Sequence, residues 1–399
     1  MWENVPIGSL GKVITGKTPP TDQAEYWGGD ELFVSPKDME RDSRYIYKTQ
    51  SLVTLKAIEK FKNQTLPRNA VMYTALSYGF GKIGIASKKL ITNQQINSII
   101  VNEENDYRFV YYLLRVSTPY IFAYNSGIDT PIVPKSVFEK IKVLVPKLST
   151  QKKIADILSA YDDFIENNNK RIELLEKAAN EIFKEWFVRM RFPGYKSLRF
   201  ENGIPQGWEI KRISDFGRVE TGKTPPTFNI DNYGGNIMFI KTPDMHGKLY
   251  VIETGEYLTE IGHSTQHKKL LPANSISVSC IGTGGIVSIN AEPAHTNQQI
   301  NSIILDDIKY LEWMFFTARS LKQTIEMFGS TGTTMTNLSK GKFEKLKVIC
   351  PTEELVYQFN EIASPILEEV KCLLLQNSTL VKQRDLLLPR LISGKIELD

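Results

Sequence analysis

The chain has 399 residues, enough for about two or three domains that each bury a core of their own. Its 49 Lys and Arg residues against 45 Asp and Glu residues leave a formal net charge of +4, which permits a polyanionic partner without requiring one. Cys280, Cys350 and Cys372 are too few and too scattered for a disulfide framework. The sequence shows neither a signal peptide nor an apolar run of roughly 18 residues, so we expect a cytoplasmic protein without a membrane partner.

The first motif is GKVITGKTPPT at residues 11–21, which satisfies the written form of a phosphate-binding loop of nucleotide hydrolases. A working loop opens directly into a helix, whereas Pro19 and Pro20 impose extended backbone immediately after Thr18. A strand ending in an Asp that could hold magnesium is also missing from the sequence. We therefore interpret the match as a coincidence of glycine and lysine spacing, with a nucleotide hydrolase kept as a rival that a nucleotide-binding assay would detect. We expect Gly16 and Gly222 to make tight turns that present Lys17 and Lys223 outward to phosphate groups.

Residues 1–149 form the first predicted domain. They are rich in Gly, Pro, Thr and short β-branched runs, a composition typical of a mixed α/β domain of short strands, loops and a helix or two. The best helix candidate within it is the apolar segment at residues 107–118.

Residues 150–190 form a long predicted helix, followed by a linker at residues 191–206. Along this helix, mostly apolar residues recur at alternating steps of four and three, and we call these residues its seam. This spacing favours a coiled coil over an ordinary amphipathic helix. About 33 residues of helix span roughly 50 Å. The seam positions are Ile154, Leu158, Tyr161, Ile165, Asn168, Ile172, Leu175, Ala179, Ile182 and Trp186.

The same organisation then repeats about 205 residues further along the chain. GRVETGKTPPT occupies residues 217–227, TNQQINSII occurs unchanged at residues 92–100 and 296–304, and FEKIKVLVP in the first copy matches FEKLKVICP in the second. This duplication predicts a second mixed domain at residues 207–351, with a helix candidate at residues 310–320. A second long helix and a C-terminal tail follow at residues 352–399.

The second long helix carries its own seam of ten positions. They are Phe359, Ala363, Ile366, Val370, Leu373, Asn377, Leu380, Arg384, Leu387 and Leu391. Pro365 is expected to bend or start this helix. If the two helices pair antiparallel, the fifth position of one seam faces the sixth of the other, so Asn168 would face Asn377 and fix the register. The alternative is that both amides point to solvent at the edge of the seam.

The sequence offers little for catalysis or metal binding. His263 and His267 have the spacing of metal ligands, but the first copy carries nothing equivalent, so a surface loop is favoured and no metal is expected. No Ser-His-Asp or Cys-His arrangement recurs in both halves. A duplicated chain without duplicated catalytic groups indicates a binding scaffold with no catalytic residues and no cofactor.

Two variable domains, each followed by a long helix, with the whole unit repeated, resemble the specificity subunit of type I restriction–modification systems. The resemblance covers essentially the full chain and is carried by the TGKTPP starts, the NQQIN segments, the VLVP and VICP strands and the C-terminal LLLPRLISGKIEL. It implies an α+β fold in which two target-recognition domains lie at opposite ends of an antiparallel two-helix coiled coil, related by a pseudo-twofold axis.

The resemblance also implies a function. The subunit would be a non-catalytic prokaryotic protein that reads a bipartite double-stranded DNA target, one domain per half-site, with an unread spacer set by the helices. Domains separated by roughly 50 Å would meet DNA about one to one and a half helical turns apart. Its implied partners are two methyltransferase (modification) subunits and, through them, restriction subunits.

The repeat also sorts the candidate DNA-binding residues, because positions identical in both halves cannot distinguish two half-sites. Identical positions are assigned to phosphate contacts or architecture, with architecture favoured for NQQIN: Lys17, Thr18, Gln94, Gln95, Lys223, Thr224, Gln298 and Gln299, alongside Asp38 and Asp244. Divergent loop positions are the base-reading candidates, since Arg and Lys can read guanine and aromatic rings can pack on base edges. These are Arg41, Arg44, Tyr45, Tyr47, Ser77, Tyr78 and Lys82 in the first half, and His246, Lys248, Tyr250, His263, His267 and Thr283 in the second.

Two other readings remain open at this point. The chain could be a stand-alone sequence-specific DNA-binding or scaffold protein without methyltransferase partners. It could also serve a related restriction system that uses a different cleavage partner.

Overall fold

The computed structural model describes residues 2–39, 44–76, 79–127, 130–197, 199–201, 204–330 and 336–398. It divides into two compact units. The first contains Met1–Asn167 and Asn377–Asp399, and the second contains Asn168–Gln376. Each unit therefore combines one globular part of the repeat with a portion of both long helices.

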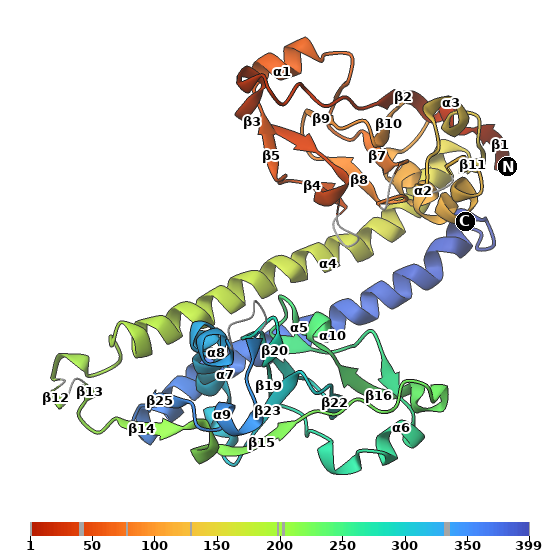
Figure 1. Cartoon of the computed structure of the whole chain (residues 1–399). Helices are drawn as coiled ribbons and strands as arrows, with labels where there is room; N and C mark the ends of the chain where they lie inside the picture. Colours follow the sequence, from red (N-terminus) through yellow and green to blue (C-terminus); the bar gives the residue numbers. More distant parts are fainter. Residues whose placement is uncertain are drawn as a thin grey trace. The chain divides into compact units, whose positions relative to one another are not determined.

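The globular part of the first unit contains two small β-sheets (Figure 1). A five-stranded sheet has the order β2-β10-β7-β8-β4, and a four-stranded sheet has the order β5-β3-β9-β6. A short strand pair, β1-β11, joins the N-terminus to the strand that leads into the first long helix. The strands are β1 (Trp2–Pro6), β2 (Gly11–Thr15), β3 (Trp27–Val34), β4 (Tyr45–Ile46), β5 (Ser51–Val53), β6 (Thr65–Leu66), β7 (Val71–Thr74), β8 (Ile83–Ala86), β9 (Leu90–Thr92), β10 (Ile96–Val101) and β11 (Lys142–Pro146).

The second unit repeats this topology. Its five-stranded sheet has the order β15-β23-β19-β21-β17, its second sheet is β18-β16-β22, and its strand pair is β14-β25. The pairs β20-β24 and β12-β13 are additional. The strands are β12 (Phe200–Glu201), β13 (Ile204–Pro205), β14 (Glu209–Arg212), β15 (Gly217–Thr221), β16 (Tyr233–Ile240), β17 (Tyr250–Val251), β18 (Tyr257–Leu258), β19 (Ile276–Ser279), β20 (Ile281–Gly282), β21 (Val287–Asn290), β22 (Ala294–Thr296), β23 (Ile300–Leu305), β24 (Thr336–Asn337) and β25 (Lys347–Cys350).

The short helices also match between the units. Helix α2 confirms the helix predicted at residues 107–118, and Asp106 caps its N-terminus by accepting bonds from the first-turn amides of Arg108 and Phe109. Helix α7 confirms the helix predicted at residues 310–320. The helices are α1 (Leu55–Lys60), α2 (Tyr107–Phe122) and α3 (Lys135–Phe138) in the first unit, and α5 (Thr242–Met245), α6 (Glu260–Ser264), α7 (Leu311–Ser320), α8 (Lys322–Gly329) and α9 (Lys340–Phe343) in the second.

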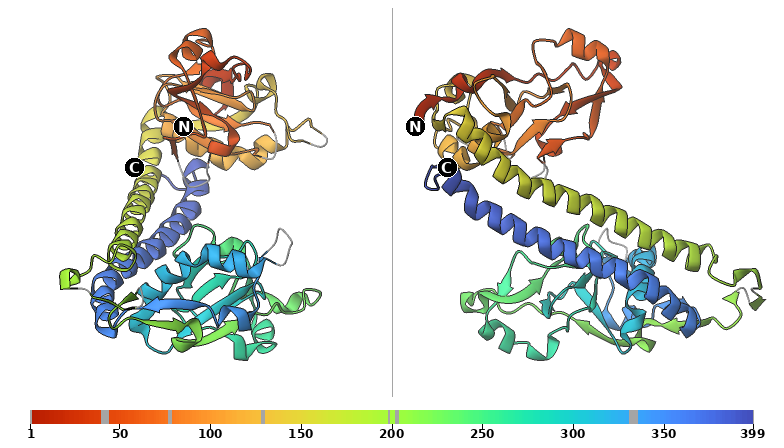
Figure 2. Two further views of the ribbon diagram at one scale, coloured as in Figure 1. Left: turned by 60° about the vertical axis from the view of Figure 1, so that its left-hand side comes forward. Right: turned by 180° about the vertical axis from the view of Figure 1, so that it is seen from behind.

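The two long helices are α4 (Leu148–Phe183), which continues into a π-helical turn at Lys184–Val188, and α10 (Glu353–Ile392). Every predicted seam position on both helices is buried or half-buried, which confirms the heptad pattern. A start of the second helix at Pro365 is wrong, because α10 begins at Glu353 and continues through this proline. Within each unit the segments of α4 and α10 run antiparallel and lie side by side (Figure 2). An ion pair links them in each unit, Asp162–Arg384 in the first and Arg171–Glu369 in the second.

The helices also complete the core of each unit. In the first, Leu158 of α4 and Leu391 of α10 join a buried cluster with the apolar face of α2. The turn after α10 packs on the N-terminus, where a Cβ on Gly394 would lie 2.7 Å from the ring of Trp2. In the second unit, Phe183 and Phe359 belong to a buried cluster with α7. The end of the chain is therefore part of the first unit.

Candidate nucleic-acid interface

The stretch that resembles a nucleotide-binding loop has a structural role in the first unit. Strand β2 ends at Thr15, and residues 16–20 continue without regular secondary structure. A Cβ on Gly16 would lie 2.1 Å from the carbonyl oxygen of Asn93, so only glycine fits against the NQQIN segment. Close packing, rather than the predicted tight turn, therefore explains this glycine. One residue beyond exposed Lys17, the hydroxyl of Thr18 donates to Gln94 Oε1 at 2.6 Å.

The second unit reproduces this arrangement. A Cβ on Gly222 would lie 2.2 Å from the carbonyl oxygen of Asn297. The Thr224 hydroxyl donates to Gln298 Oε1 at 2.5 Å, and Lys223 is exposed. We call these two segment pairs, residues 15–18 with 92–97 and residues 221–224 with 296–301, the loop frames.

Asn and Gln side chains hold each loop frame together. Asn93 Oδ1 accepts the backbone N–H of Gln95, and Asn93 Nδ2 donates to Gln95 Oε1 at 2.9 Å. Asn297 and Gln299 make the same two contacts in the second unit. These bonds satisfy loop backbone internally, which supports the architectural reading of NQQIN. The side chains that remain exposed are Lys17 and Gln94, and their counterparts Lys223 and Gln298.

Asp38 and Asp244 likewise stabilise turns. Asp38 Oδ2 accepts the amide of Ser35 at 2.8 Å and its Oδ1 accepts the amide of Gln50 at 2.7 Å. Asp244 accepts the amides of Lys241 and Gly255 in the same way. Both carboxylates are therefore committed to backbone.

The base-reading candidates of the first unit separate into three groups. Arg41, Ser77 and Tyr78 lie outside the described residues. Arg44 is only 4% exposed and forms ion pairs with Asp163 and Glu166 on α4, so its assignment as a base reader is corrected to a structural role.

The other three candidates lie at or near the surface. Tyr45 is half-buried and its hydroxyl lies 3.1 Å from that of Tyr107. Tyr47 is exposed. Lys82 is half-buried, and its Nζ donates to the carbonyl of Pro36 at 2.8 Å. Tyr47 is thus the most accessible of the three.

In the second unit the surface candidates are His246, Lys248, His267 and Thr283, all of which are exposed. Tyr250 is 1% exposed and belongs to the main core, so its assignment as a base reader is also corrected. Burial raises the pKa of its phenol well above the usual range.

His263 is half-buried and contacts a histidine that the sequence did not single out. Its Nδ1 lies 2.9 Å from Nε2 of His295, which is fully buried. Burial, followed by the proximity of His263, lowers the pKa of His295 to about 4. The equivalent residues of the first unit are Ile58 and Ile91, both buried. The signal for this pair was present in the repeat, where His295 replaces the apolar residue that precedes TNQQIN.

Metal binding finds no further support. Among the described residues, no group of three or more His, Cys, Asp or Glu side chains is placed to hold a metal ion. Cys280 and Cys350 are buried, whereas Cys372 is exposed. None of the helices in the described part of the chain has the length and apolar character needed to span a membrane.

Comparison with known proteins identifies the fold and the family of this chain. The S subunit of the type I restriction–modification system from M. genitalium shares the fold, with a TM-score of 0.64 and 16% identity, covering 98% of this chain and 96% of that chain. Residues 1–177 and 205–367 match the type I restriction modification DNA specificity domain.

Two sequence relatives agree with this match. The type I restriction enzyme MjaIX specificity subunit of Methanocaldococcus jannaschii is 29% identical, covering 100% of this chain and 94% of the relative. The HindI specificity subunit of Haemophilus influenzae is 32% identical, covering 66% of this chain and 71% of the relative. The chain belongs to the type I restriction–modification specificity family. It is the DNA specificity subunit of a type I enzyme, a non-catalytic component of that complex.

Proposed function

We propose that each unit reads one half of a bipartite double-stranded DNA target. The observation that carries this proposal is the duplicated loop frame: Thr18–Gln94 and Thr224–Gln298 have the same geometry in both units, while the surrounding loops differ. A shared frame with divergent loops is what a protein needs in order to position two domains identically on DNA and read different bases.

Lys17 and Lys223 contact DNA phosphates in this proposal. Each is exposed at the edge of a frame, next to a threonine whose hydroxyl is bonded to a glutamine. Gln94 and Gln298 orient the lysine-bearing loop, and Gln95 and Gln299 maintain the frame. Such contacts fix register on the duplex without carrying sequence information.

Base reading is assigned to side chains in the divergent loops, of which Tyr47 in the first unit and His246, Lys248, His267 and Thr283 in the second are exposed. Tyr47 and Lys82, with the undescribed Arg41, Ser77 and Tyr78, serve the first half-site, and Tyr45 supports them from its half-buried position. The second half-site is read by His246, Lys248, His267 and Thr283, with His263 behind them. Basic, aromatic and hydroxyl groups of these kinds can pair with base edges in the major groove.

The long helices dock two methyltransferase subunits in this proposal, and restriction subunits join through them. Large apolar side chains are exposed on both helices: Phe164 and Leu174 on α4, and Leu386 on α10. In this proposal these exposed apolar side chains form part of the surfaces that contact the partner subunits.

The proposal is tested by mapping methylated adenines in cells that carry this chain with its cognate modification subunit. Wild type is expected to give a bipartite motif, and His246→Ala/Lys248→Ala is expected to relax that motif in one half only. Lys342→Ala/Lys347→Ala, which removes two exposed lysines of the same unit, serves as the control and leaves the motif unchanged. Relaxation of both halves, or no motif with both proteins present, would contradict the proposal.

A further inference from the structure

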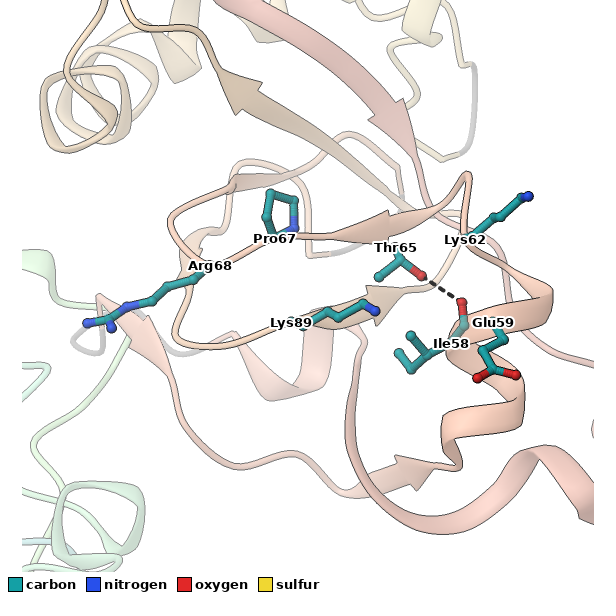
Figure 3. Close-up of a pocket in the computed structure, with 7 residues that line it drawn as sticks. All are labelled: Ile58, Glu59, Lys62, Thr65, Pro67, Arg68 and Lys89. Carbon is teal, nitrogen blue, oxygen red and sulfur yellow. Dashed lines mark hydrogen bonds between the residues drawn. The ribbon is translucent and has the colours of Figure 1, made fainter.

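The first unit contains a broad surface groove of about 770 Å³ beside helix α1 (Figure 3). Its walls come from α1, from the β6 region and from the turn that precedes β9. Ile58 and Pro67 supply apolar surface, and the hydroxyl of Thr65 donates to the carbonyl of Ile58 at 3.2 Å. No residue assigned to DNA contact so far lines this groove.

The groove is strongly basic. Lys62, Arg68 and Lys89 line it, and Glu59 is the only acidic lining residue. All three cations are exposed, and within the residues that the structure describes none of them takes part in an ion pair. Neighbouring Lys88, by contrast, is already paired with Glu31 at 3.2 Å. Cations without an acidic partner are available to an external anion.

The arrangement of the cations indicates the shape of that anion. In Figure 3, Arg68 and Lys62 extend at opposite ends of the groove, and Lys89 lies between them. A single phosphate or a small metabolite would need cations that converge on one point. Cations spaced along a groove instead suit an extended polyanion.

One contact links the neighbourhood of the groove to the loop frame. Lys17 Nζ lies 5.7 Å from the centre of the Phe61 ring, and Phe61 immediately precedes Lys62. The aromatic residue that Lys17 contacts is therefore the chain neighbour of Lys62, the first cation of the groove. A nucleic-acid strand bound at Lys17 would have a basic path along the groove.

The second unit lacks this charge. The two regions can be aligned residue by residue. Thr259 caps α6 as Thr54 caps α1. In the strands, His295 lies opposite Phe239 as Ile91 lies opposite Phe33. At the positions of Lys62, Arg68 and Lys89, the second unit has His267, Ala273 and Pro293. The three cations that line the groove are therefore not repeated at the equivalent positions of the second unit.

From these observations we infer that the groove of Lys62, Arg68 and Lys89 holds a phosphate backbone segment of the target DNA beside the first half-site. This inference rests on the proposed function. It adds an asymmetry to that function, because the first unit contacts more phosphates than the second. These contacts anchor the duplex and do not read bases.

The test measures DNA affinity of the complex of this chain with its modification subunits, over a range of salt concentrations, on duplexes carrying the mapped motif. Lys62→Ala/Arg68→Ala/Lys89→Ala is expected to lower the slope of log affinity against log salt by about 2 to 3, since each phosphate contact contributes roughly 0.9. The methylated motif is expected to stay the same. Trimming the duplex outside the first half-site is expected to weaken wild type but not the variant.

Two controls separate this effect from a general change of charge. Lys12→Ala/Lys140→Ala/Lys142→Ala removes three exposed lysines of the same unit away from the groove, and its salt slope is expected to match wild type. Lys62→Arg/Arg68→Lys/Lys89→Arg keeps the charge and is expected to keep the slope.

An unchanged slope in the alanine variant, or an equal loss in both alanine variants, would overturn the inference. A motif relaxed in its first half would also overturn it, because the groove would then read bases. A bipartite wild-type motif leaves the proposed function intact in each of these cases, whereas its absence would contradict the proposed function itself.

Discussion

The two units differ in the side chains that pack between α4 and α10 at equivalent positions. In the first unit, Arg384 Nη1 lies 2.6 Å from Asp162 Oδ1, both side chains are buried, and the Tyr112 hydroxyl donates to the other carboxylate oxygen. The repeat places Ala179 and Leu367 at the positions of Arg384 and Asp162 in the second unit, where both are fully buried. The contact between the two helices therefore contains an ion pair in the first unit and only apolar groups at the same positions in the second.

The second unit compensates with aromatic rings. Phe359 packs against Phe187 and Trp186, with ring centres 5.1 and 5.9 Å away. Its counterpart in the first unit is Ile154. Buried apolar contacts stabilise without strong directionality, whereas a buried ion pair contributes less net stability and penalises any register that separates its charges. The comparison indicates that apolar packing holds the two helices together in the second unit. In the first unit, a buried ion pair also fixes the register of one helix against the other.

The largest effect is expected for Phe359→Ala. Removing a fully buried ring that contacts several others should lower the free energy of unfolding by about 4 kcal/mol, through lost burial and the cavity left behind. Ile154→Ala, the matched change in the first unit, should cost about 2 to 3 kcal/mol because less side chain is removed. Urea unfolding of both variants measures the two losses in free energy of unfolding. Equal losses would contradict the contrast between the helix–helix contacts of the two units.

Asp162→Ala should cost about 3 kcal/mol, because it leaves the buried Arg384 without its main partner. Asp385, 2.9 Å from Arg384 Nη2, limits the loss. Arg171→Ala breaks the exposed pair with Glu369 and should change stability by less than about 0.5 kcal/mol.

The triple change Asp162→Leu/Arg384→Met/Tyr112→Phe makes the helix–helix contact of the first unit apolar at these positions. It should recover at least wild-type stability, since replacing a buried ion pair by packed apolar groups is often neutral or stabilising. Thermal unfolding distinguishes these outcomes. A triple variant as unstable as Asp162→Ala would show that the first unit cannot accept an apolar seam.

Much of the fold could be predicted because it depends on periodicity and repetition. The two helices inside the domains, the heptad seams and the duplicated organisation were all visible in residue spacing. The continuation of α10 through Pro365 was not, since burial of Ala363 and Leu367 on either side outweighs the local cost of the proline.

The candidate site was harder to predict, because a polar residue type does not reveal its partner. Arg44 is paired with Asp163, which lies 119 residues away in sequence, and no local spacing announces that contact. Tyr250 follows a loop but lies inside the core. The frame residues were easier, because identity between the copies marked Gly16 and Gly222 as constrained, although the constraint is close packing rather than a turn.

The His263–His295 contact extends the contrast between the units to a smaller, pH-dependent effect. The pKa of His295 is lowered to about 4 by burial and by His263, while an unfolded histidine binds its proton below about 6.5. Between these values the unfolded chain binds more protons than the folded one, so the stability of the second unit should fall as pH drops from about 6.5 to 4.

His263→Ile/His295→Ile copies Ile58 and Ile91 of the first unit and should remove this part of the pH dependence. The measurement is the melting temperature of wild type and variant between about pH 7 and 4, where the pKa shift places the effect. Carboxylates titrate in the same window in both proteins, so the informative quantity is the difference between the two curves. Parallel curves would mean that His295 accepts a proton without loss of stability, and that the second unit tolerates charge at positions where the first unit has buried isoleucines.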